Sequence, residues 1–153
     1  MFTPDEVAGI VDLFGALTRA EAERAVSELA YRRGGEPPGN AVDEALAAFA
    51  LVAVDRDGDR LVAPGPAAFP ELPEGAEDLP HILGTDGRSL DREAAVDAAV
   101  SRFREEAVGA AKSGDGDRVA ALVDVSYDLE AWSGADLSAL RERLDAVGDG
   151  TNY

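Results

Sequence analysis

The stretch that decides the fold is residues 51–63, LVAVDRDGDRLVA. Two mostly aliphatic runs, 51–54 and 60–63, flank a short polar segment with Asp57-Gly58 at its centre. An Asp-Gly step is typical of a two-residue hairpin turn, because both residues tolerate the positive φ that such a turn requires. The sequence therefore predicts a β-hairpin here, in a chain that is otherwise patterned for helices.

Helices are predicted before this hairpin. Residues 3–6, TPDE, and 18–21, TRAE, each fit a capping box, in which Thr caps the helix and Glu three residues later completes the cap. Apolar residues at helical spacing follow both boxes. Gly15 and Gly34-Gly35 are expected to end these helices. Asn40 is expected to cap a third helix, which runs up to the hairpin.

Three helices followed by a hairpin resemble a winged-helix domain, and the resemblance covers residues 3 to about 69. It rests on the order and lengths of the elements. The resemblance implies that the third helix would enter the major groove of DNA and that the hairpin would contact phosphates.

A proline-rich connector is predicted next. Five of the eight prolines lie at positions 64, 66, 70, 73 and 80. Proline lacks a backbone N–H and disfavours helix, so we expect an extended segment. Phe69 and Leu72 are expected to pin it to the core, and residues 79–83 to form a short packed segment.

The C-terminal part is predicted to be helical. Apolar spacing predicts a long helix from about Asp91 to Lys112 and a short helix from Arg118 to Val123. Ser126 is expected to cap a further turn, and Asp136 to cap a last helix.

The predicted fold class is mainly α with one β-hairpin. The predicted organisation comprises a winged-helix-like part (1–70), the Pro-rich connector (71–90), a helical part packed on the first (91–147) and a frayed tail (148–153). No internal repeat is visible.

The charge of the chain indicates the solvent to which it is adapted. The net charge is −17 at pH 7, and Lys112 is the only lysine beside thirteen arginines. In dilute buffer such a chain repels itself, whereas about 1 M salt shortens the Debye length to about 3 Å. A GC-rich genome also favours Arg, but it does not explain the acidic excess. We therefore interpret the composition as that of a halophilic, cytoplasmic protein.

Composition also excludes several classes of site. The chain has no Cys, which excludes disulfides, thiolate zinc sites and Cys nucleophiles. The acidic N-terminus lacks the basic and apolar regions of a secretory signal. No apolar run approaches the roughly 18 residues that span a membrane, so we expect no membrane partner.

Three strings in this chain are similar to those of a haloarchaeal family of small, uncharacterised, acidic proteins. They are VDLFGALT (11–18), PGPAAFP (64–70) with EDLPHIL (77–83), and DVSYDLEAW (124–132). The likeness covers most of the chain. It implies a haloarchaeal origin and one shared architecture, but it does not identify any catalytic residues in this chain.

Arginines form the candidate contacts to nucleic acid or to a partner. Arg24, Arg32 and Arg33 lie on or after the second helix, and Arg56 and Arg60 lie in the hairpin. The predicted third helix has no Lys or Arg. Phosphate affinity depends on cationic contacts and falls steeply with salt, so charge disfavours DNA as the partner.

Other candidate sites have a structural explanation. Asp55, Asp57 and Asp59 mimic the start of a calcium loop, but an EF-hand requires Gly at its sixth position and Glu at its twelfth. His81, the only histidine, is expected to pack. Tyr127 and Trp132 are expected in the core, the alternative being an exposed contact for a partner. Acidic pairs on the long helix are expected to face solvent.

We therefore predict no catalytic, cofactor-binding or metal-binding residues. The favoured function is a non-enzymatic protein-interaction or regulatory adaptor whose partner is a protein, self-association included. The alternative is a winged-helix DNA-binding transcriptional regulator. A small enzyme comes third, because no nucleophile–base pair or phosphate loop is visible.

Overall fold

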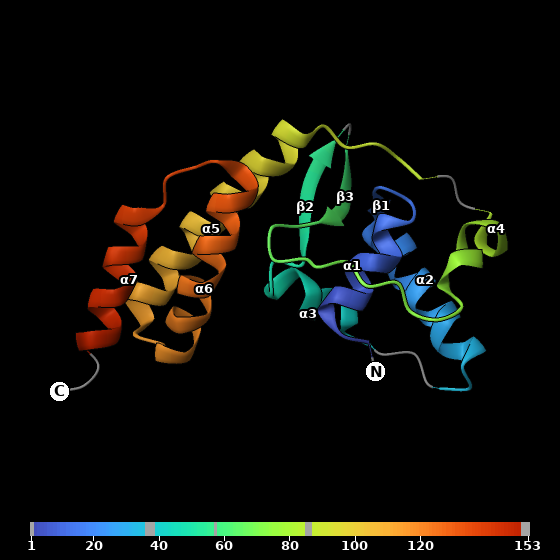
Figure 1. The fold of residues 1–153 in the computed structure, drawn as a ribbon, viewed down its shortest axis with the longest axis horizontal. Helices are drawn as coiled ribbons and strands as arrows, with labels where there is room; N and C mark the ends of the chain where they lie inside the picture. The colour runs from blue at the N-terminus through green and yellow to red at the C-terminus, as the bar shows by residue number, and fades with distance from the viewer. Residues whose placement is uncertain (1, 36–38, 57, 85–86, 151–153) are drawn as a thin grey trace. The chain divides into compact units, whose positions relative to one another are not determined.

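The computed structural model describes residues 2–35, 39–56, 58–84 and 87–150, with side chains to residue 147. The prediction of a mainly α protein with a hairpin is confirmed (Figure 1). The chain divides into two compact units, Met1–Ala95 and Val96–Tyr153.

The first unit contains most of the elements. In chain order these are α1 (Pro4–Asp12), β1 (Leu17–Thr18), α2 (Arg19–Arg32), α3 (Ala41–Ala47), β2 (Leu51–Arg56), β3 (Asp59–Pro64), the 3₁₀-helix η1 (Ala76–Asp78), α4 (Leu79–Leu83) and the start of α5 (Arg92–Ser113).

Both predicted capping boxes are confirmed. The Thr3 hydroxyl accepts from the Glu6 amide over 3.1 Å, and the Glu6 carboxylate accepts from the Thr3 amide over 3.1 Å. At α2 the corresponding distances between Thr18 and Glu21 are 3.2 Å and 2.9 Å. The predicted Asn40 cap is wrong: its side chain makes no capping bond, because its ψ of 18° departs from the extended backbone of a capping residue.

The hairpin lies in a three-stranded antiparallel sheet with the order β1-β3-β2. Leu51 pairs with Pro64 and Arg56 with Asp59, which confirms the predicted hairpin, while Asp57 of the predicted turn lies outside the described residues. Strand β1 was not predicted, since a two-residue strand shows no periodicity. It pairs Leu17 with Val62.

The segment between β3 and η1, residues 65–75, is called the connector from here on, and backbone contacts hold it against α1. The Asp5 carboxylate accepts from the Phe69 amide over 3.1 Å, and the Asp5 carbonyl accepts from the Glu71 amide over 3.0 Å. The backbone of Glu71 packs on Gly9, where an added Cβ would lie 2.2 Å from the Glu71 carbonyl oxygen. The prediction that Phe69 and Leu72 pin the connector is wrong, since both side chains are exposed. The contact between the Glu71 backbone and Gly9 holds this segment against α1 instead.

The core of the first unit lies between its helices and one face of the sheet. The largest fully buried side chains of this unit include Phe49, Ile10, Leu17, Leu29, Leu51 and Leu79. The segment 79–83 is the short helix α4, and it packs through Leu79.

The second unit consists of the remainder of α5, α6 (Gly116–Ser133) and α7 (Ser138–Gly150). The predicted break between residues 123 and 126 is wrong, because α6 is continuous and Ser126 is buried inside it. Asp136 accepts from the Ser138 amide at the start of α7, as a cap would. Helix α7 continues to Gly150, past the predicted start of fraying, and residues 151–153 lie outside the described part.

The buried residues of this unit are mostly small or aliphatic. They include Phe103, Ala107, Leu122, Leu129, Leu137 and Leu144.

Candidate functional site

The predicted arginines on α2 lie near its C-terminal end. Arg32 and Arg33 are exposed and border a shallow depression with Leu29, Glu74 and Gly75. Arg32 Nε is 3.9 Å from a Glu28 carboxylate oxygen. Arg33 donates to the Glu74 carbonyl over 3.1 Å, and its guanidinium lies 5.4 Å from the centre of the Phe2 ring. Arg24 is exposed more than two turns earlier on the same helix.

The predicted arginines of the hairpin lie elsewhere. Arg56 donates to the Ser89 carbonyl over 2.6 Å, and Arg60 donates to the Asp55 carboxylate over 3.2 Å. Within the first unit, the hairpin turn and the C-terminal end of α2 lie at opposite ends (Figure 1). The structure therefore brings Arg32 and Arg33 together at one depression, but the register of the hairpin directs Arg56 and Arg60 to opposite faces, and the hairpin lies apart from the end of α2.

The exposed face of α3 is acidic. Asp43 and Glu44 are exposed there beside Ala47, and α3 contains no Arg or Lys. The guanidinium of Arg19, at the start of α2, donates to the Asp43 carboxylate and to Glu23. These bonds raise the pKa of Arg19 above its ordinary value, Asp43 contributing most. Arg19, which contacts α3 through Asp43, is therefore already paired.

Sequence reasoning missed Arg19 and Arg88. The i,i+4 spacing of Arg19 and Glu23 is a usable signal for one half of the Arg19 contact. No local signal points to Arg88, which donates to the Glu21 carboxylate over 2.5 Å from 67 positions away. This hydrogen bond is the main cause that lowers the pKa of Glu21 below its ordinary value.

Large apolar side chains are exposed on the first unit. Tyr31 on α2 is 77% exposed, Phe69 75% and Leu72 46%. Phe69 and Leu72 are near neighbours on the connector, and Pro70 and Glu71 between them are also exposed. Exposed side chains of this size that gather on one segment are typical of contact surfaces.

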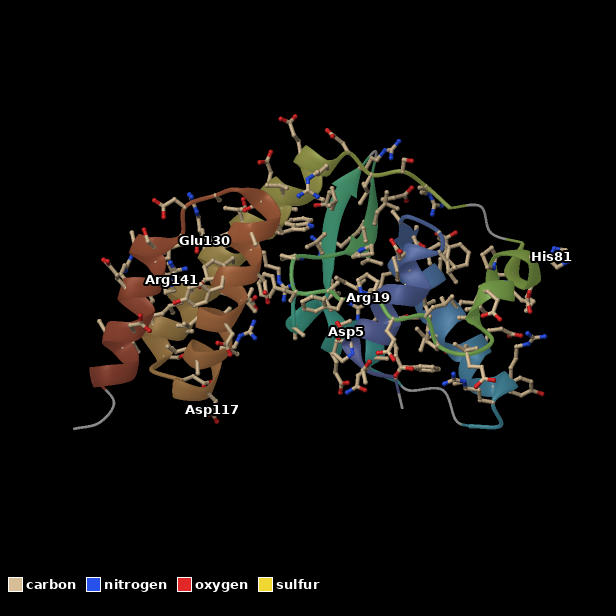
Figure 2. The ribbon with its side chains drawn as sticks, viewed as in Figure 1. Asp5, Arg19, His81, Asp117, Glu130 and Arg141 are labelled. Atoms are coloured by element: carbon tan, nitrogen blue, oxygen red, sulfur yellow. The ribbon has the colours of Figure 1, made fainter. Side chains whose placement is uncertain are left out.

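The second unit carries a polar cluster between α6 and α7. Arg141 donates to the Ser126 hydroxyl over 3.1 Å and to the Glu130 carboxylate over 2.7 Å, while Glu130 also accepts from the Leu137 amide over 2.9 Å (Figure 2). The Leu137 amide, followed by Arg141, holds the pKa of Glu130 below its usual range. The geometry joins the two helices.

Tyr127 belongs to the same cluster. Its ring lies 4.2 Å from the Arg141 guanidinium carbon, and the side chain is 56% exposed. The expectation that Tyr127 lies in the core is wrong, because α6 directs it outward from the α6–α7 seam. Trp132 is half-buried.

A second cluster joins α5 and α6. Arg102 Nη2 lies 3.3 Å and Arg118 Nη2 2.9 Å from oxygens of Glu106. Burial lowers the pKa of Arg102 below its ordinary value, despite the opposing effect of Glu106. One carboxylate thus bridges two guanidiniums.

The remaining candidates are dispersed. His81 is exposed on α4, contrary to the expectation that it packs, and Figure 2 shows it directed away from that helix. Among the described residues, no group of three or more His, Asp or Glu could hold a metal ion. In the same part of the chain, no helix has the length and apolarity needed to cross a membrane.

Comparison with known proteins identifies a family and nothing further. Residues 5–149 match the sequence model of a protein family, DUF7109, which is described as a family of unknown function. No curated protein and no solved structure matches the chain.

Proposed function

The chain belongs to the DUF7109 family, a family of unknown function, and we propose that this member is a non-enzymatic protein-interaction or regulatory adaptor. The observation that carries the proposal is the acidic face of α3. Asp43 and Glu44 are exposed on it, and Arg19 beside it is paired. A phosphate backbone approaching this face would meet carboxylates.

The exposed side chains of the first unit support a protein as the partner. Phe69 and Leu72, which are near neighbours on the segment after β3, leave about three quarters and nearly half of their surface in water. Protein interfaces are enriched in Tyr and Phe and are depleted of charge at their centre. The proposed adaptor uses its first unit as the contact module.

A second candidate function is a winged-helix transcriptional regulator. The order α1-β1-α2-α3-β2-β3, with β1 and β2 flanking β3, is the observation that favours it. In a winged helix, α3 reads the major groove and the β2–β3 hairpin contacts the backbone. We propose that the first unit has this architecture and that its α3 serves protein contacts instead, because α3 offers DNA no cation.

The net charge of −17 supports a halophilic cytoplasm as the setting. There, molar salt screens the self-repulsion of the chain and weakens phosphate contacts. Both effects favour an adaptor over a DNA-binding protein.

The experiment compares the two functions on the full chain. Mobility-shift assays with duplex DNA in dilute buffer and in about 1 M KCl are paired with chemical cross-linking in native lysate. The adaptor proposal expects no DNA shift and a cross-linked protein in stoichiometric amounts.

A DNA complex in molar KCl would overturn the proposal if changing Arg24, Arg32, Arg33, Arg56 and Arg60 to Ala abolishes it. The matched control changes Arg104 and Arg143, which are exposed on the second unit, to Ala. That control distinguishes a specific DNA face from a general loss of positive charge.

A further inference from the structure

We propose that the connector strip, which we define as Phe69, Pro70, Glu71 and Leu72, is a docking surface for a protein segment that carries apolar side chains flanked by Arg or Lys. This inference rests on the proposed function as an adaptor and names the surface and the chemistry of its partner.

The backbone of the connector strip is held in one conformation. Asp5 accepts from the amides of Phe69 and Glu71 over 3.1 Å and 3.0 Å. The Glu71 backbone lies directly on Gly9, where an added Cβ would come within 2.2 Å. Such a strip loses little conformational entropy when it binds, so it is pre-organised for a partner.

Both flanks of the connector strip are anchored as well. Before it, the Ala67 amide donates to the Phe49 carbonyl over 3.0 Å. After it, Pro73, Ala76 and Leu79 are buried. The exposure of the strip is therefore a property of a fixed segment packed on the first unit.

The side chains of the connector strip point outward. Phe69 is 75% exposed and Leu72 46%, and Pro70 is exposed between them. Three residues of chain span at most about 10 Å, so both apolar side chains are within reach of one bound segment. Single exposed apolar residues are common, whereas here two large apolar side chains and a proline are exposed within four residues of a fixed segment.

The charge around the connector strip selects the partner. The sequence has no Lys or Arg from Leu61 to Gly87, whereas Glu71, Glu74, Glu77 and Asp78 lie on or just after the strip. Arg33 reaches the Glu74 carbonyl, but within the described residues no cation is paired with the carboxylates of Glu71 or Glu74. A basic segment complements this rim, whereas a second copy of this acidic chain or a nucleic acid carries charge of the same sign and offers it no complement.

The test uses two labelled helical peptides with leucines at positions i, i+3, i+4 and i+7. One carries arginines beside the leucines and the other carries glutamates. Fluorescence anisotropy measures their affinity for the full chain. We expect the arginine peptide to bind more tightly, and Phe69→Ala with Leu72→Ala to weaken it by about tenfold or more.

Tyr31→Ala is the matched control, since Tyr31 is an equally exposed aromatic side chain of the same unit and lies on α2. It is expected to leave affinity unchanged, and all variants are expected to unfold like the parent. Equal affinity for both peptides, an unaffected double variant, or an equal effect of Tyr31→Ala would each overturn the proposal.

Cross-linking separates this inference from the adaptor proposal. A partner that is captured equally by the parent and by the double variant would overturn the docking surface and leave the adaptor function standing. Specific DNA binding with no protein partner would overturn both. A captured partner that needs Phe69 and Leu72 and is cross-linked through a basic segment supports the docking surface.

Discussion

Arg141 on α7 donates to the Glu130 carboxylate on α6 over 2.7 Å, and the same nitrogen donates to the buried Ser126 hydroxyl over 3.1 Å. Its guanidinium also lies 4.2 Å from the centre of the Tyr127 ring. One side chain thus satisfies a carboxylate, a buried hydroxyl and an aromatic face. Helices α6 and α7 are joined by this cluster as well as by their apolar contacts.

Arg141→Ala is expected to lower the stability of the second unit. The change leaves the Ser126 hydroxyl without its donor and the Glu130 carboxylate without its cation, which costs more than losing an exposed pair. Urea unfolding followed by the fluorescence of Trp132 measures it. Arg143→Ala, an exposed change on the same helix, should have a small effect; an equal loss in both variants would contradict the role of the cluster.

Replacing Gly9 by Ala is expected to destabilise the first unit by about 1–3 kcal/mol, because the new methyl group overlaps the Glu71 carbonyl. Gly109→Ala is the control, since Gly109 is also inside a helix but has open space around it. That change should stabilise by about 0.5–1 kcal/mol through helix propensity. The midpoints of denaturant unfolding are measured for both variants. If Gly9→Ala raises the midpoint as Gly109→Ala does, the connector does not lie on α1.

Thr18→Ala is expected to cost about 1 kcal/mol, since the Glu21 amide loses its acceptor at the start of α2. The control is Ser27→Ala, which lies within α2 and replaces Ser with a better helix former. Thermal unfolding should separate the two variants, Thr18→Ala having the lower midpoint. A midpoint unchanged from the parent would show that Thr18 does not cap α2.

The pair of Glu21 and Arg88 is expected to make stability depend on pH. Because the folded state lowers the pKa of Glu21, its contribution is fully present above the unfolded value of about 4.3 and is lost as pH falls through the folded pKa. Glu21→Gln removes the charge and keeps an amide that can still cap. The stability difference between parent and variant should therefore shrink below about pH 4.3, and a difference that stays constant there would contradict the pair.

Thermal stability is expected to rise from dilute buffer to about 2 M KCl, since salt screens the repulsion within a chain of net charge −17. Differential scanning fluorimetry in KCl and in a neutral osmolyte at equal osmolality separates screening from water exclusion. A flat response to KCl would count against the proposed halophilic setting.

Features encoded by neighbouring residues could be predicted from the sequence. The caps at Thr3 and Thr18, and the hairpin that pairs Val54 with Leu61, depend on residues a few positions apart. The errors fell where distant residues decide the outcome. Strand β1 exists because Leu17 pairs with Val62, and the buried Ser126 hydroxyl inside α6 accepts from Arg141, which is 15 positions later in the chain.

The candidate arginines show the same division. Their identity and the lack of cations on α3 follow from composition, but their separation follows from where α2 ends and from the register of the hairpin, which directs Arg56 and Arg60 to opposite faces. Only the structure shows that Arg19 is paired with Asp43.

By itself the sequence determined the charge, the helix starts and the hairpin, because these depend on composition and on local hydrogen bonds. The tertiary structure alone decided which apolar side chains are buried. Phe69 and Leu72 are residue types that are usually buried. They are exposed because the connector contacts α1 through its backbone, at the oxygen acceptors of Asp5 and at Gly9. A backbone that packs flat on a helix leaves its side chains to point into solvent.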